Sequence, residues 1–183
     1  YTPQHTLSLH DALPIWLAQL LRRHGLRRLD HYAIFMENNA RYIEACAAGE
    51  RAGLYYTCIN SHLNAEELAF IVNDSLARVL ITSRAQREVA HAALASCPRL
   101  ELLLMLDAGP DDTPFVDYEG AIAAMPATPI ADESLGGAML YSSGTTGRPK
   151  GVLRPLPEAA PEELTPLFRA LHTMWHHRPG MVY

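Results

Sequence analysis

The sequence predicts an α/β fold, with a mainly parallel sheet covered by helices on both faces. Short apolar runs of strand length alternate with segments of ten or more residues that favour helix. Repeated alternation of this kind implies right-handed crossovers between parallel strands. The run Leu100–Leu106 is strongly apolar, as expected of a strand that is buried on both faces.

The first half of the chain contains two expected helices and two expected strands. Apolar residues recur at helical spacing from Ile15 to His24 and stop near Gly25, which predicts the first helix. Two short runs rich in β-branched or aromatic residues then flank an alanine-rich helix. These three elements are expected at Tyr32–Met36, Asn39–Ala52 and Leu54–Ile59.

A third helix is expected to begin at a capping box. Asn64 is followed three residues later by Glu67, which is the spacing that satisfies two backbone N–H groups reciprocally. Leu68, Ile71 and Val72 would then lie on one face of the helix.

Further along, a strand at Arg78–Thr82 precedes Ser83, which we expect to cap a helix that ends at Ala95. The strand Leu100–Leu106 follows. Segments rich in Pro, Asp and Gly predict loops, at Asp107–Pro114 and Met125–Leu135.

Composition excludes several classes of protein. The 183 residues are 49% apolar and 19% charged, with a net charge of −5, so a disordered chain is excluded. The basic residues are scattered, and we expect no nucleic-acid partner. The longest nearly uncharged stretch, Ala12–Leu21, has about half the residues needed to cross a bilayer. We therefore expect a soluble, cytoplasmic protein without a transmembrane segment, and its oligomeric state stays open.

The three cysteines are expected to be packing residues. Cys46, Cys58 and Cys97 form no C-x-x-C pair and leave one over. This argues against a disulfide framework or a thiolate zinc site and fits a reducing compartment.

Both ends of the chain look cut. The chain begins at Tyr1 rather than Met and ends on apolar residues. Residues 1–15 show no helical or strand period and resemble translated sequencing-adapter read-through, so we expect a non-native segment there. Residues 16–183 are expected to be part of one domain.

The segment Tyr141–Val152, YSSGTTGRPKGV, has a composition that packing does not explain. Glycines at positions 144 and 147 allow successive backbone N–H groups to turn inward, and four hydroxyl side chains lie among them. Lys150 is the sole lysine of the chain. A concave loop of amides, hydroxyls and one ammonium suits phosphate groups.

This segment has three other interpretations. A polar surface loop of Gly, Ser and Thr is the simplest. A Walker loop is disfavoured because Pro149 precedes Lys150 and Gly151 follows it, so a helix does not begin there. The nucleophile-elbow pattern G-x-S-x-G is also absent. We therefore expect a strand, a phosphate-binding loop and a second strand.

Tyr141–Val152 resembles the signature phosphate-binding loop of the adenylate-forming superfamily, which includes acyl-CoA synthetases, firefly luciferase and nonribosomal peptide adenylation domains. Asn39–Ser83 resembles the stretch that these enzymes place before the loop, and the similarity covers most of residues 16–183. The resemblance implies part of the large N-terminal domain of such an enzyme.

The resemblance implies a two-step ligation that uses ATP, Mg²⁺ and coenzyme A. A fatty or aryl carboxylic acid would be adenylated with release of pyrophosphate, and coenzyme A would then displace AMP. The loop residues would hold the β- and γ-phosphates: Ser142, Ser143, Gly144, Thr145, Thr146, Gly147 and Lys150.

The family's adenine, ribose and catalytic-lysine segments have no counterpart in this chain. No catalytic residue is therefore assigned, and we expect the isolated 183-residue chain to form no acyl-CoA. Two alternatives stay open. The chain could be a non-catalytic nucleotide- or phosphate-binding module, or a gene fragment with no independent role.

Two further groups of side chains are assigned no role in a site. His172 and His176 have the spacing of a metal-binding pair on an expected helix, Glu162–Trp175, but the H-E-x-x-H pattern is absent and we expect no metal site. Asp111 and Asp112 are expected to be solvated.

Overall fold

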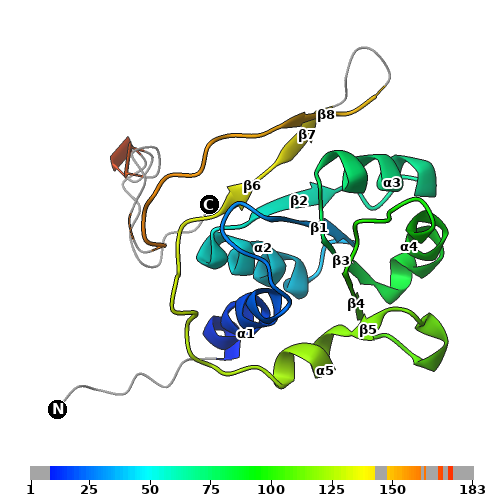
Figure 1. Ribbon diagram of the computed structural model, residues 1–183, viewed down its shortest axis with the longest axis horizontal. Coiled ribbons are helices and arrows are strands. Elements are labelled where there is room, and N and C mark those ends of the chain that lie inside the picture. Colours follow the sequence, from blue (N-terminus) through cyan, green and yellow to red (C-terminus); the bar gives the residue numbers. More distant parts are fainter. Residues whose placement is uncertain (1–8, 143–147, 162, 164–168, 171–172, 175–183) are drawn as a thin grey trace.

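The computed structural model describes residues 9–142, 148–161, 163, 169–170 and 173–174 (Figure 1). At its centre is a six-stranded sheet in which every pairing is parallel, in the order β5-β4-β3-β1-β2-β6. The strands are β1 His31–Phe35, β2 Tyr55–Ile59, β3 Val79–Ser83, β4 Leu102–Leu106, β5 Val116–Asp117 and β6 Gly137–Ala138.

Helices cover both faces of this sheet, which confirms the predicted fold class. Figure 1 shows α1, α2 and α5 on one face and α3 and α4 on the other. The helices are α1 Leu9–Arg23, α2 Ala40–Ala52, α3 Ala65–Asp74, α4 Arg87–Leu94 and α5 Tyr118–Ala123, with 3-10 turns at Arg84–Gln86 and Pro110–Asp112.

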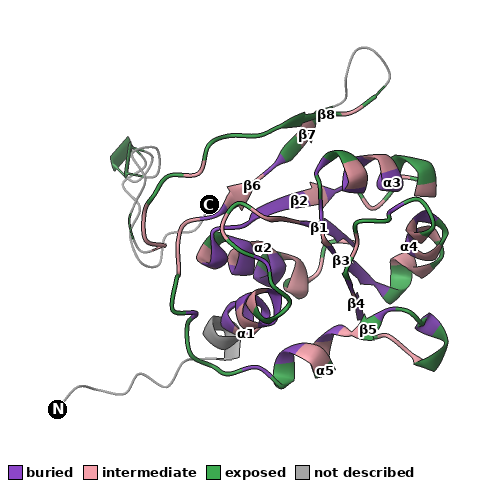
Figure 2. Ribbon diagram, in the orientation of Figure 1, coloured by how far each residue is buried: buried purple, intermediate pink, exposed green. Residues whose placement is uncertain are grey.

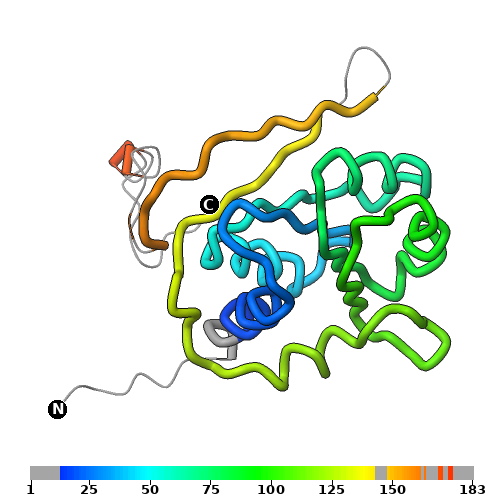
Figure 3. The backbone as a smooth tube through the Cα atoms, in the orientation of Figure 1, coloured from blue at the N-terminus to red at the C-terminus, as the bar shows by residue number. Residues whose placement is uncertain are grey.

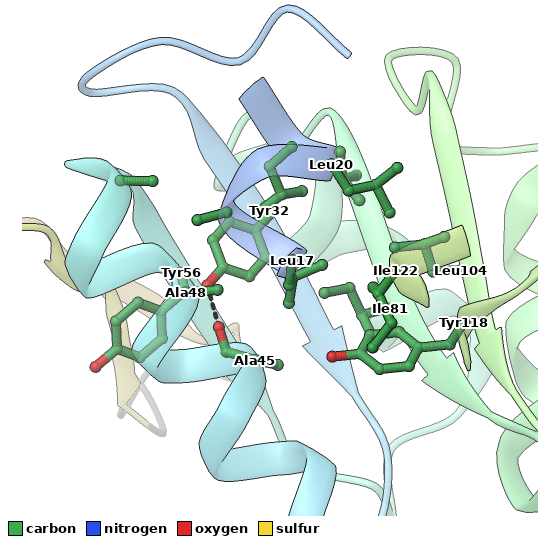
Figure 4. Close-up of a cluster of buried hydrophobic side chains, with 14 of the residues drawn as sticks. Leu17, Leu20, Tyr32, Ala45, Ala48, Tyr56, Ile81, Leu104, Tyr118 and Ile122 are labelled. Atoms are coloured by element: carbon green, nitrogen blue, oxygen red, sulfur yellow. Dashed lines mark hydrogen bonds between the residues drawn. The ribbon is translucent and has the colours of Figure 1, made fainter. Parts of the chain in front are cut away.

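Alternation along the strands divides the core into two layers. Successive side chains of a strand point to opposite faces. On β3, Ile81 therefore joins the core beneath α1, α2 and α5, whereas Leu80 joins the core beneath α3 and α4. Figure 2 shows that the central strands are buried along most of their length. In the first layer, the hydroxyl of the fully buried Tyr32 donates a hydrogen bond to the carbonyl of Ala45 (Figure 4).

A two-stranded hairpin and a return segment lie beside the sheet. β7 Leu140–Ser142 pairs antiparallel with β8 Lys150–Val152. The chain then runs back toward β6, as Figure 3 shows. The Tyr55 hydroxyl donates to the Arg154 carbonyl at 2.7 Å, and the Leu135 amide donates to the Ala159 carbonyl at 2.9 Å.

Most predicted elements are confirmed, with bounds that shift by one or two residues. The Asn64 side chain accepts from the Glu67 amide, and the Glu67 carboxylate accepts from the Asn64 amide, each at 3.0 Å. The capping box is therefore present as predicted, and Leu68, Ile71 and Val72 are buried.

The first helix begins six residues before the predicted start. Leu13 and Ile15 are only 4% and 3% exposed and lie in the core. Leu13 precedes Leu17 and Leu20 at spacings of four and seven, so the apolar stripe extends into the segment that we expected to lack a period. Pro14, inside the helix, obscured this pattern in the sequence.

Ser83 does not cap a helix with its side chain, contrary to prediction. Its hydroxyl donates instead to the Glu37 carboxylate, and a 3-10 turn separates it from α4. The cause is non-local, because Glu37 follows β1, the strand that pairs with β3.

The prediction that Asp112 is solvated is also wrong. Its side chain is fully buried and accepts the Gly109 amide at 2.7 Å, while the Arg87 guanidinium lies 3.2 Å away. Asp111 is exposed, as predicted.

Two short elements, β5 and α5, were not predicted from the sequence. Asp117 caps α5 by accepting the Gly120 amide at 2.8 Å. Tyr118 is fully buried. With two and six residues, these elements are too short to show a period.

No helix in the described part of the chain is long and apolar enough to span a membrane. The helix expected at Glu162–Trp175 lies largely outside the described residues, as do His172 and His176.

Candidate functional site

The two strands of the predicted strand-loop-strand arrangement are present and form a hairpin. β7 and β8 pair in a register that places Ser142 opposite Lys150 and Tyr141 opposite Gly151. Both Ser142 and Lys150 are exposed. The other five expected phosphate ligands lie outside the described residues: Ser143, Gly144, Thr145, Thr146 and Gly147.

The edge strand β6 positions the hairpin. The Gly137 amide donates to Leu54 at 3.0 Å, and the Met139 amide donates to Tyr56 at 2.9 Å. Since β6 runs parallel to β2, the chain leaves the sheet toward the carboxyl ends of its strands. Ligands of open α/β sheets bind at this edge.

Contacts with α3 brace β7 and the residues just before β8. The Tyr141 hydroxyl donates to the Asp74 carboxylate at 2.5 Å, and the Arg148 guanidinium carbon lies 5.5 Å from the centre of the Phe70 ring. Burial and the Asp74 carboxylate raise the pKa of Tyr141, so its hydroxyl remains a donor at neutral pH.

Tyr141 and Met139 pack closely against Gly151. A Cβ atom at position 151 would lie 3.0 Å from the Tyr141 ring and 2.5 Å from the end of the Met139 side chain. A larger residue on this strand would push the Tyr141 ring and the Met139 side chain aside. This explains the glycine after Lys150 by packing, without appeal to a ligand.

Positive charge flanks the segment 143–147 on one side. Lys150 and Arg148 are exposed, and no ion pair among the described residues includes either of them. A hollow of about 310 Å³ lies between Arg148 and the first turns of α3. It is lined by Asn64, Glu66, Glu67, Phe70, Arg148 and Pro149.

A second cleft, of about 380 Å³, was not expected from the sequence. It lies where the connections after β1 and β3 turn in opposite directions, which is a preferred ligand position in such sheets. Its charged lining residues are three carboxylates and two guanidiniums: Glu37, Asp107, Glu119, Arg41 and Arg84. The strand order would have indicated this cleft, had it been predicted.

The charges of this second cleft do not favour a triphosphate. Arg41 is already bound to Glu44 at 2.8 Å and to Glu119 at 2.7 Å. Partial burial opposes ionisation of Glu37, but hydrogen bonds from Ser83 and Asn39 outweigh it and lower the pKa of this carboxyl. An anionic cleft repels phosphate. The hollow beside Arg148 also has two carboxylates, Glu66 and Glu67, in its lining. The hairpin is nevertheless the better candidate, because Lys150 and Arg148 have no carboxylate partner among the described residues, whereas Arg41 has two.

In the described part of the chain, no group of three or more His, Cys, Asp or Glu side chains is placed to hold a metal ion. All three cysteines are free, but Cys46 and Cys58 are only half-buried and lie next to each other, whereas Cys97 is buried alone. Sequence spacing gave no signal for this pair, because the two cysteines belong to different elements.

Comparisons with known proteins identify relatives of the chain. Residues 16–158 match the family described as AMP-binding enzyme. The chain is 31% identical over 153 residues to the human protein "Acetyl-coenzyme A synthetase 2-like, mitochondrial", covering 75% of this chain and 22% of that protein. It is 28% identical over 145 residues to a medium-chain-fatty-acid–CoA ligase of Ectopseudomonas oleovorans, covering 75% and 27%.

Solved structures agree with these relatives. The anthranilate CoA ligase AuaEII, in complex with anthranoyl-AMP, superposes with a TM-score of 0.72 at 25% identity, covering 78% of this chain and 28% of that one. A fatty acyl CoA synthetase of Mycobacterium tuberculosis shares the fold, with a TM-score of 0.66 at 24% identity and coverage of 79% and 28%.

The chain thus spans about a quarter of the length of these relatives. The family match extends over more than half of its residues and ends beyond the hairpin, at residue 158. The matched region contains the parallel sheet, the helices on both faces and both strands of the hairpin. The chain therefore belongs to the AMP-binding enzyme family.

Proposed function

We propose that this chain carries the triphosphate-binding loop of an ATP-dependent acyl-CoA synthetase that acts on a fatty or aryl carboxylic acid. The single observation that carries the proposal is the hairpin. Its strands hold Ser142 opposite the sole lysine of the chain, beside a segment rich in glycine and hydroxyl side chains. Membership of the AMP-binding enzyme family supports this assignment.

The loop would act in the first of two chemical steps. A carboxylate oxygen of the acid bonds to the α-phosphorus of ATP, and the bond from that phosphorus to the bridging oxygen breaks to release pyrophosphate. Coenzyme A then attacks the acyl carbon through sulfur and releases AMP. Negative charge grows on the departing pyrophosphate, so donors aimed at it stabilise the transition state more than the ground state.

The described residues have the chemistry that this role requires. The Lys150 ammonium and the Arg148 guanidinium have no carboxylate partner among the described residues. A charge-assisted hydrogen bond contributes about 1.5–3 kcal/mol. The contacts of Tyr141 and Arg148 with α3 hold the backbone near Lys150 in place. This lowers the entropy lost when the Lys150 side chain binds an anion.

Magnesium would be a partner of the nucleotide rather than of this part of the protein. The described residues offer no cluster of acidic or histidine ligands. Mg²⁺ in nucleotide sites keeps several water ligands and binds the phosphate oxygens directly. Ser142 and Lys150 would then contact the phosphate oxygens that the metal leaves open.

The test is the effect of Lys150→Ala on nucleotide binding and on adenylation. For the 183-residue chain, calorimetric titration with MgATP should give a Kd raised by about 10-fold, the equivalent of one lost charge-assisted bond. Arg154→Ala is the matched control, because it removes an exposed positive charge just beyond β8. It should change the Kd by less than about 2-fold, as screened surface charges do.

In the full-length enzyme of which we propose this chain to be part, Lys150→Ala should slow ATP–pyrophosphate exchange on the order of 10²-fold. Nucleotide binding that depends on Lys150 in a full-length protein without carboxylate-dependent exchange would favour a non-catalytic nucleotide-binding module. Equal binding by the Lys150→Ala and unsubstituted chains would contradict any phosphate role for this loop.

A further inference from the structure

Two of the three cysteines form a close pair that the proposed ligase chemistry does not use. The Sγ atoms of Cys46 on α2 and Cys58 on β2 lie 3.7 Å apart. Both side chains pack at the margin of the first core layer and are half-buried. Cys97 belongs to the second layer, on the opposite face of the sheet. The chain therefore contains one dithiol and one isolated thiol.

The surroundings of the pair divide its protons unequally. The adjacent Cys46 sulfur and the Tyr42 hydroxyl favour the ionised form of Cys58 and, against the opposing effect of burial, lower the pKa of Cys58 to about 7. The interaction with the Cys58 sulfur, together with burial and the nearby Glu50 carboxylate, raises the pKa of Cys46. Cys58 is thus the more acidic thiol of the pair and is partly ionised near neutral pH.

This arrangement has the parts of a peroxide-reactive centre. A thiolate is the nucleophilic form of cysteine, and a second thiol beside it can resolve the first oxidation product. The two sulfurs need to approach by only about 1.6 Å to reach a disulfide bond length of about 2.05 Å. Burial raises the pKa of Cys97 and leaves it without a neighbouring thiol, so it lacks both properties.

We propose that Cys46 and Cys58 form a peroxide-sensitive dithiol that closes to a disulfide between α2 and β2. The Cys58 thiolate attacks one peroxide oxygen, the O–O bond breaks, and Cys58 sulfenic acid and hydroxide form. The Cys46 sulfur then attacks the sulfenic sulfur, the S–O bond breaks, and water leaves with the Cys46 proton. The hydroxide takes up the proton that Cys58 released to solvent on ionising. Two thiols are thereby oxidised and one peroxide is reduced to two waters.

A soft metal ion is a weaker explanation for the pair. Structural zinc requires four ligands. Among the described residues, no third His, Cys, Asp or Glu joins the pair in a metal-binding group. A disulfide needs no further ligand. It would link α2 covalently to β2, the strand that pairs with β6.

The test is mass spectrometry of the reduced 183-residue chain after exposure to hydrogen peroxide at pH 7. Thiols are alkylated in denaturant at successive times, and peptides are mapped. We expect a disulfide between Cys46 and Cys58, with Cys97 still alkylated. Weighing thiolate fraction against the lower nucleophilicity of a more acidic thiol, Cys58 should react roughly 10-fold faster than Cys97.

Variants assign the two steps. In the Cys46→Ser chain, Cys58 should accumulate as sulfenic acid that dimedone traps. In the Cys58→Ser chain, the remaining Cys46 thiol should react with peroxide no faster than Cys97 does. Cys97→Ala is the matched control and should leave the rate of pair oxidation unchanged. The mapping of the unsubstituted chain decides the question even if a variant fails to fold. Equal oxidation of all three cysteines, or cross-links to Cys97 as often as within the pair, would overturn the proposal.

Discussion

At the scale of single residues, Gly136 determines how closely the chain approaches α2 before it reaches the hairpin. Its amide donates to the Glu50 carbonyl at 2.9 Å. A Cβ atom at this position would lie 2.1 Å from the Gly49 carbonyl oxygen and 2.6 Å from that of Leu54. Both atoms belong to backbone that cannot rotate away, so only glycine fits here.

We expect Gly136→Ala to lower the free energy of unfolding by about 1–3 kcal/mol, the cost of forcing an extra methyl group into packed structure. Urea denaturation followed by circular dichroism measures this change. Gly109→Ala is the control, because the nearest atom to its Cβ would be the flexible end of Arg84, at 3.3 Å. A loss in Gly109→Ala as large as in Gly136→Ala would contradict the explanation by close approach.

Single residues also show where sequence reasoning succeeds and fails. Lys150 could be predicted as a candidate phosphate ligand, because a sole lysine in a glycine-rich segment is unusual by composition alone. The Cys46–Cys58 pair and the burial of Asp112 could not be predicted, because each depends on contacts between different elements. Five of the seven expected phosphate ligands lie outside the described residues, so the complete phosphate site stays a prediction.

At the scale of elements, short sequence patterns predict those helices and strands that local interactions stabilise. The capping box of α3 involves residues three apart and is found where the sequence placed it. β5 and α5 instead depend on pairing with β4 and on burial of Tyr118, which no short window of sequence reveals. The early start of α1 was missed because a proline within the helix masks its apolar stripe.

The 3-10 turn Pro110–Asp112 gives a pH-dependent prediction. The Gly109 amide, followed by the Arg87 and Arg84 guanidiniums, lowers the pKa of Asp112, although desolvation opposes this. Because its pKa is lower in the folded than in the unfolded chain, the carboxylate stabilises the fold above about pH 4. This contribution is lost as the pH falls through the folded-state pKa.

We expect Asp112→Asn to be less stable than the unsubstituted chain at pH 7, with a difference that narrows at pH 3. Urea unfolding at both pH values measures it. Asp111→Asn, at the exposed neighbouring position, should change stability little at either pH. A deficit in Asp112→Asn that is unchanged between pH 7 and pH 3 would show that packing, not charge, makes Asp112 important.

At the scale of the whole molecule, the two core layers share the same central strands. Leu80 and Ile81 are consecutive residues of β3 that lie in opposite layers. Since neither layer can lose its strand without disturbing the other, we expect the sheet and all its helices to unfold together.

Leu80→Ala and Ile81→Ala should each lower the free energy of unfolding by about 2–5 kcal/mol. Trp16, half-buried against the first layer, reports on that layer by fluorescence in a Trp175→Phe background. Leu80→Ala alters the second layer, yet it should shift the Trp16 transition as much as the circular dichroism transition. If the Trp16 signal instead stayed at its original urea midpoint, the layers would be independent units.

The return segment after β8 has a consequence for the solution behaviour of the chain. β6 pairs with β2 through only two residues and by itself forms a very short border to the sheet. Arg28 holds the carbonyls of Leu156 and Pro157 at 3.2 and 3.1 Å, so the segment lies along that border. Prolines at positions 155 and 157 cannot donate backbone hydrogen bonds. The border is thereby closed with a stretch of chain that is a poor template for another strand, which protects against edge-to-edge aggregation.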